Sequence, residues 1–182
     1  LSGVLDKYSD EAIQNFLDMD LSFAFYAGAL SLYKRLGDRG FPCVKPTLKT
    51  GKTVSILAKG VYPSELALDE TVVTVPNDVR FTEEGKFYIL TGANSSGKTV
   101  FLTSVGQLVW LVSLGFYVPC ESVEIVPASG IFTIFSGGET DDYSDSRMGN
   151  EVRQLRDTLP AVNSRSFILF NEPLTSTSPK EG

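Results

Sequence analysis

The stretch that decides the fold of this chain is Gly92-Ala93-Asn94-Ser95-Ser96-Gly97-Lys98-Thr99, which satisfies the G-x-x-x-x-G-K-[ST] phosphate-loop (P-loop) pattern in full. Backbone N–H groups of such a loop point inward at a polyphosphate, and the following helix adds the partial positive charge of its N-terminus. The loop residues predicted to bind the nucleotide, ATP, are Gly92, Asn94, Ser95, Ser96, Gly97, Lys98 and Thr99. Lys98 would reach the β- and γ-phosphates, and the Thr99 hydroxyl would ligate Mg²⁺. The alternative is an ordinary Gly/Ser loop that precedes a helix.

The sequence on both sides of the loop supplies the context that this motif requires. Residues 87–91 are apolar and predict a buried strand, and residues 100–110 predict a helix. A strand, loop and helix in this order favour a P-loop nucleoside triphosphatase of the α/β class, with a mixed or parallel sheet flanked by helices.

Composition bounds the kind of protein. Hydrophobic residues at 42% and charged residues at 21% are typical of a globular core. No apolar run approaches the roughly 18 residues that span a bilayer, so we expect no membrane contact. Two cysteines without a metal-binding spacing favour packing thiols and a cytoplasmic location, and the lack of histidine excludes His-based triads. The net charge of −6 argues against tight DNA binding by this chain alone.

Two regions are expected along the chain. Residues 7–36 predict a long helix with an apolar stripe whose middle is buried on more than one side, and Gly37 and Gly40 end it. Residues 1–43 would therefore be a helical region, and residues 44–182 an α/β nucleotide domain. Further strands are predicted at 54–58, 70–75, 122–126, 130–135 and 166–170, and a helix that carries Met148, Val152, Leu155 and Leu159 is predicted to end at Pro160.

The second half of the site is predicted where the apolar strand 166–170 ends in Asn171-Glu172. Acidic residues at this position hold Mg²⁺ and the attacking water in P-loop enzymes. Glu172 is the candidate general base, and with Lys98 it makes up the predicted catalytic pair. Asn171 stands where Asp is usual, and an amide oxygen lacks the charge that Mg²⁺ prefers. We therefore expect Thr99 and Asn171 to bind the metal weakly and turnover to be slow. The alternative is a surface Asn-Glu turn.

Several segments in order resemble the MutS family. These are residues 91–99, 115–120, 123–127 and 131–133, with 75–78 upstream and 141–151 and 177–182 downstream. The match covers about residues 70–182, the family's C-terminal ATPase domain up to its Walker B and D-loop segments, and the chain looks like an excised part of a longer protein. Residues 7–40 resemble, more weakly, the end of the all-α core and lever helices that precede this domain.

The resemblance implies an ABC-class ATPase that uses ATP and Mg²⁺ and works as a homodimer through this domain. Val75 and Asn77 would contribute to the nucleotide site, and Ser146 would meet the partner's γ-phosphate in trans, although Ser146 is also a good helix N-cap. DNA would bind through regions outside this chain, and repair proteins would be recruited according to the ATP state. Asn171, the Arg147-Met148-Gly149 run and Thr74 depart from the family pattern and suggest a MutS-like paralogue.

Two functions follow as rival hypotheses. The first is an ATPase that gates a dimeric DNA clamp in mismatch repair or recombination. The second is an ATP-gated dimerisation module with vestigial hydrolysis and no mismatch specificity, for which Asn171 is the sequence clue. Whether the chain hydrolyses ATP by itself stays open, because half of the expected site comes from another subunit.

Overall fold

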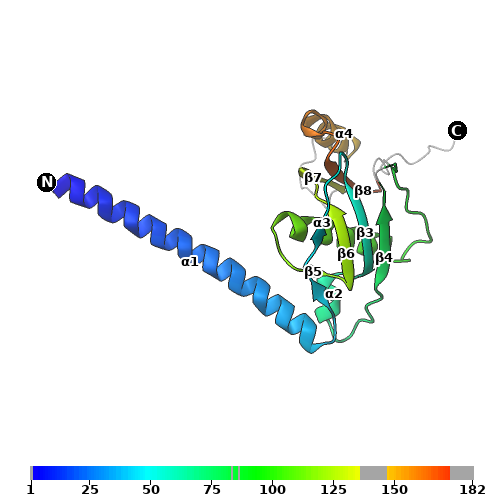
Figure 1. The fold of residues 1–182 in the computed structure, drawn as a ribbon. Coiled ribbons are helices and arrows are strands. Elements are labelled where there is room, and N and C mark those ends of the chain that lie inside the picture. Colours follow the sequence, from blue (N-terminus) through cyan, green and yellow to red (C-terminus); the bar gives the residue numbers. More distant parts are fainter. Residues whose placement is uncertain (1, 83, 86, 136–146, 173–182) are drawn as a thin grey trace.

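The computed structural model describes residues 2–82, 84, 85, 87–135 and 147–172, and it has an α/β architecture (Figure 1). The helices, in chain order, are α1 (Ser2–Asp38), α2 (Ser64–Leu68), α3 (Lys98–Ser113), α4 (Arg147–Thr158) and the 3-10 helix η1 (Leu159–Ala161). The strands are β1 (Cys43–Val44), β2 (Thr47–Leu48), β3 (Ser55–Val61), β4 (Asn77–Phe81), β5 (Val118–Pro119), β6 (Ser122–Val126), β7 (Gly130–Phe135) and β8 (Ser166–Asn171). No helix among these described residues is long and apolar enough to cross a membrane.

The strands form three small sheets. The largest has the order β2-β6-β3-β4, in which β2 and β6 are parallel and the other neighbours are antiparallel. β7 and β8 pair in parallel from Gly130↔Ser166 to Phe135↔Asn171, and β1 pairs with β5. The strands therefore pair in both parallel and antiparallel directions, as predicted, but they form separate sheets and not one continuous sheet.

The main hydrophobic core lies between α3 and the inner face of the four-stranded sheet. Alternate residues of β3 and β6 face inward, so Ile56 and Ile125 are each 1% exposed and pair directly across the two strands. Leu108 of α3 is completely buried in the same cluster. This alternation is the period-2 pattern of a sheet with one buried face, and it fixes which side of the sheet α3 covers.

The long helix α1 extends away from the rest of the molecule and meets it toward its C-terminal end (Figure 1). Leu36, in its last turn, is 1% exposed and packs in a second cluster with Tyr62 and Ala67. The prediction of a buried middle was wrong for this chain, because Phe23 and Leu30 are each 66% exposed. The body covers only one side of this part of α1, where Phe25 and Tyr26 contact the ring of Phe116 and Tyr33 contacts Phe116 and Tyr117.

Two of the predicted strands do not form. In residues 70–75 the carboxylate of Asp69 accepts bonds from the Thr71 amide and hydroxyl, and Val73 is 88% exposed. The strand lies instead at β4, directly after this segment. Residues 87–91 lie in no sheet, and Ile89 is 89% exposed. Tyr88 is instead held beside β4, where its ring is 4.4 Å from that of Phe81 and its hydroxyl accepts the Thr82 N–H.

Both cysteines are free thiols, as predicted. Cys120 is completely buried in the main core, and burial raises the pKa of its thiol to about 12. Cys43 lies 3.6 Å from the hydroxyl of Tyr62, which donates to the Pro42 carbonyl oxygen at 2.8 Å. Burial raises the pKa of the Tyr62 hydroxyl far above its ordinary value. These groups are therefore uncharged packing elements at neutral pH.

Candidate nucleotide-binding site

The phosphate loop leads directly into α3. Ser95 and Gly97 have φ values of 62° and 87°, in the left-handed region that glycine tolerates best. A turn bond joins the Ser96 N–H to the Ala93 carbonyl oxygen at 3.2 Å, and α3 begins at Lys98 with no side-chain cap. The first N–H groups of an uncapped helix have no acceptor inside the helix. The loop therefore ends at donors and a helix dipole that favour an anion.

Lys98 lies over its own loop. Its ammonium donates to the carbonyl oxygens of Gly92 at 2.9 Å and Ala93 at 2.8 Å. An ammonium group carries three donors, so these two bonds hold the charge at the loop and leave capacity for a further acceptor. The structure thus places a positive charge beside the same loop whose helix favours an anion.

Thr99 joins the loop to the end of β8. Its hydroxyl donates to Oδ1 of Asn171 at 3.3 Å, across 72 positions of sequence. Two oxygen ligands on adjacent corners of a Mg²⁺ octahedron lie about 3 Å apart, because each Mg–O distance is about 2.1 Å. The two residues that sequence predicted as metal ligands are therefore in contact, and their oxygens have a spacing that suits Mg²⁺. Both groups are neutral, and among the described residues no group of three or more acidic, thiol or imidazole side chains is arranged so that it could hold a metal ion.

Glu172 follows β8 directly and is the predicted general base. Its φ is 48°, an uncommon conformation for a residue with a Cβ, and its side chain is exposed. The left-handed turn ends the extended run of β8 beside the Thr99–Asn171 contact. Glu172 therefore follows directly on the residue that contacts the end of the loop, and its role as general base stays a prediction.

Val75 and Asn77, which were predicted to contribute to the nucleotide site, are not brought to the loop by any described contact. Val75 is 66% exposed, and its carbonyl oxygen accepts from the side chain of Asn77 at 2.9 Å. This bond joins the two residues to each other at the start of β4. Ser146 and the segment 177–182 lie outside the described residues, so the prediction of a site completed in trans stays a prediction.

Sequence reasoning missed the residue that allows α3 to lie against β8. A Cβ on Gly106 would lie 2.7 Å from Cδ1 of Leu169, so the helix and the strand approach closely at this point. Gly106 is in the same helix as Thr99, and Leu169 is in the same strand as Asn171. A glycine inside an apolar helix was the available signal, since glycine in a helix interior usually marks a close approach.

Two surface hollows, of about 370 and 540 Å³, lie on the outer face of the four-stranded sheet. Leu57 and Glu124 line both of them, and none of the predicted site residues lines either. An antiparallel sheet commonly leaves one polar face to solvent, which accounts for these hollows. The loop is an open surface feature, so its chemistry and not its depth marks it as the candidate site.

Comparison with known proteins agrees with this geometry. The sequence model of a protein family described as MutS domain V matches residues 88–182. This range contains the loop, α3 and β8. The chain belongs to the MutS family. Domain V is the ATPase domain of that family.

Two of the relatives show the range of the similarity. The DNA mismatch repair protein MutS of Chlorobium chlorochromatii is 32% identical over 143 residues, which is 78% of this chain and 16% of the relative. The endonuclease MutS2 of Alkaliphilus oremlandii is 27% identical over 184 residues, which is 100% of this chain and 22% of the relative. The chain thus spans about a fifth of the length of such relatives, or less.

Proposed function

We propose that this chain is the nucleotide-binding part of a MutS-family ATPase whose ATP state gates a dimeric clamp on DNA. The observation that carries the proposal is the contact of Thr99 with Asn171, which puts the end of the phosphate loop against the end of β8. Residues 44–182 would form the ATPase domain, and residues 1–43 the end of a helical region. DNA would be contacted through regions outside this chain, repair proteins would be recruited according to the ATP state, and the second copy would be met through the ATPase domain itself.

Each side chain has a role in this proposal. The loop amides and Lys98 bind and orient the phosphates, because their N–H groups are the donors at the start of α3. Thr99 and Asn171 hold Mg²⁺, which would neutralise charge on the β- and γ-phosphates when bound. Glu172 accepts a proton from the attacking water. The amide of Asn171 supplies an oxygen without a charge, so the metal is held weakly and turnover is slow.

Calorimetric titration of the full-length protein with Mg-ATP tests this proposal, with Lys98→Ala and a matched Lys45→Ala control. Lys45 is an exposed lysine that lines a hollow on the sheet and not the loop. We expect the Lys98 variant to lose binding and the Lys45 variant to bind as the wild type does. If all three proteins bind equally, the loop is not the nucleotide site. If none binds, the proposed function fails.

The second candidate, an ATP-gated dimerisation module with vestigial hydrolysis, is favoured by one observation, the neutral amide of Asn171 beside Thr99. Asn171→Asp adds the missing charge and separates the two candidates. We expect steady-state ATP turnover to rise in this variant and Glu172→Gln to abolish it. Unchanged turnover in both variants would remove the enzyme and leave the dimerisation module. The relatives include proteins named MutS and proteins named MutS2, so the paralogue assignment stays a prediction.

A further inference from the structure

The short helix α2 has both of its ends capped by side chains from elsewhere in the chain, one from α3 and one from the residue that follows α1. At its N-terminal end, Oε1 of Gln107 in α3 accepts from the Ser64 N–H at 3.2 Å and from the Ser64 hydroxyl at 3.3 Å. Nε2 of the same Gln107 donates to the carboxylate of Glu65. The residue before the helix, Pro63, supplies no side-chain cap. The P-loop helix therefore provides the cap that α2 lacks in its own sequence.

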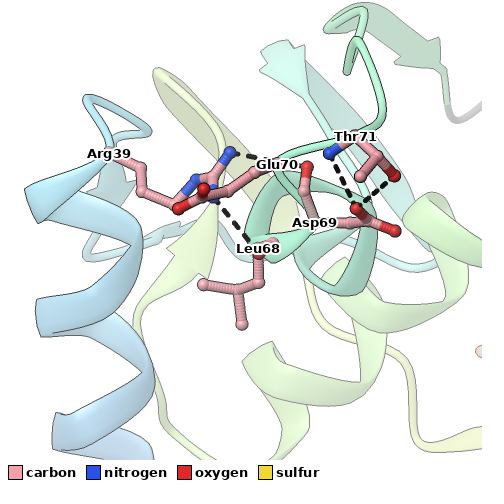
Figure 2. Close-up of polar contacts among 5 residues, drawn as sticks. All are labelled: Arg39, Leu68, Asp69, Glu70 and Thr71. Carbon is pink, nitrogen blue, oxygen red and sulfur yellow. Dashed lines mark hydrogen bonds and ion pairs between the residues drawn. The ribbon is translucent and has the colours of Figure 1, made fainter.

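The C-terminal end of α2 is capped from α1. The guanidinium of Arg39, the residue after α1, donates to the carbonyl oxygens of Leu68 at 3.2 Å and Asp69 at 3.4 Å (Figure 2). Nη1 of Arg39, the atom that donates to Leu68, also lies 3.3 Å from the Glu70 carboxylate. A cation at the last carbonyls of a helix satisfies groups that have no partner inside the helix. Arg39 is itself held in place, since its side chain is only 28% exposed.

An apolar contact joins α1 and α2 beside these polar ones. Leu36 of α1 and Ala67 of α2 are each 1% exposed in one cluster with Tyr62. A helix of five residues is too short to persist in water without such tertiary support. The position of α2 is therefore set by α1 at one end and by α3 at the other, and the chain after α2 leads to Val75 and Asn77.

We propose that Arg39 and Gln107 are positioning residues of the nucleotide site, which through α2 make the orientation of α1 and the occupancy of the phosphate loop depend on each other. The inference rests on the proposed function, namely that the loop binds ATP. A movement of α1 shifts Arg39 and the C-terminal end of α2, and α2, which is bonded at both ends, passes the shift to Gln107 and α3. Coupling of this kind is reciprocal, so ATP at the loop also affects α1.

Calorimetry of Mg-ATP binding to the full-length protein measures the coupling in Arg39→Ala, Gln107→Ala and the double variant. The matched control is Arg35→Ala, which removes an exposed arginine of α1 four residues earlier. We expect each single variant to weaken binding by about 2- to 30-fold. The double variant should bind more tightly than the product of the two effects predicts, because both residues act on one helix. Arg39→Lys keeps the charge and should lie between the wild type and Arg39→Ala.

Hydrogen exchange separates coupling from a general loss of structure. At saturating ATPγS we expect the amides of residues 64–71 to exchange more slowly in the wild type and in Arg35→Ala, and to show no such change in Arg39→Ala. Binding of Arg39→Ala and Gln107→Ala within twofold of Arg35→Ala, or the same ATPγS protection in all proteins, would overturn the inference. If the wild type binds ATP through Lys98 and the Arg39 and Gln107 variants bind it equally well, the coupling inference fails while the proposed function stands. The proposed function fails with it if the wild type does not bind.

Discussion

Substituting Gly106 by alanine tests how closely α3 must approach β8 to form the site. The new methyl group would lie 2.7 Å from Cδ1 of Leu169, a contact that requires a shift, and Leu169 is only 5% exposed. Overpacking of a core costs about 1–3 kcal/mol. Alanine in a helix interior gains about 1 kcal/mol over glycine. The net result is a destabilisation of about 0–2 kcal/mol, and we expect the strain to be divided between a shift of the Leu169 side chain and a displacement of α3 from the strand that carries Asn171.

The assay must measure the stability of α3 and β8 themselves, because a large protein does not unfold in one step. Hydrogen exchange of the amides in α3 and β8 gives the opening free energy of these elements. Mg-ATP affinity reports the Thr99–Asn171 contact. Leu169→Val removes one methylene at the point of the clash. The double variant of Gly106→Ala with Leu169→Val should therefore have a higher opening free energy and a higher Mg-ATP affinity than Gly106→Ala alone. If Gly106→Ala alone protects the amides by about 1 kcal/mol and leaves ATP affinity unchanged, the close approach does not control the site.

Three further predictions concern the packing and the titration of single groups. Tyr62→Phe removes the donor to the Pro42 carbonyl oxygen and should lower the local opening free energy, measured by hydrogen exchange of the amides around residues 43–44 and 62, by about 0.5–1.5 kcal/mol; unchanged exchange would contradict this role. The pKa of Cys120 is raised to about 12, so native protein at pH 9 should not react with a thiol reagent at this site, and stability should fall as the pH rises from about 9 to 12 because the unfolded thiol ionises first; rapid labelling of Cys120 without unfolding would count against its burial. Hydrogen bonds from the Thr71 hydroxyl and amide lower the pKa of Asp69, and their stabilisation is present above the ordinary carboxyl pKa and lost as the pH falls through the lowered one. Thr71→Val should therefore raise the pKa of Asp69 in an NMR titration, and an unchanged pKa would show that the hydroxyl bond does not matter.

Much of the fold could be predicted where pattern and partner agree. The strands β6 and β7 were predicted at their observed bounds, and α3 was expected from the loop motif. β4 was missed although Val79 and Phe81 alternate with polar residues, which is the period of a half-buried strand. The run 70–75 was preferred for its β-branched residues, but such residues favour a strand only where a neighbouring strand receives them. Local composition therefore identified the wrong side of Pro76.

The segment 87–91 shows the same limit at the site. Its apolar residues predict a buried strand, yet strand formation depends on a ladder partner that local sequence does not specify. Tyr88 finds an alternative in Phe81 and in the Thr82 amide, which places the segment beside β4. By contrast, the loop itself needed no distant partner to be recognised, since its glycines, lysine and threonine are fixed by spacing alone.

The candidate site therefore rests on two kinds of information. The phosphate-binding half is local, because the loop and the first turn of α3 are contiguous in sequence. The proposed metal-binding half depends on packing, because Thr99 meets Asn171 only where α3 lies against β8. Gly106 permits that approach, and the next residue of α3, Gln107, bonds to the start of α2. A motif thus predicts that the loop favours phosphate, but the position of α3 would decide how well the proposed site can hold a metal ion. On the proposed function, any element that moves α3 would therefore alter catalysis without contact with the nucleotide.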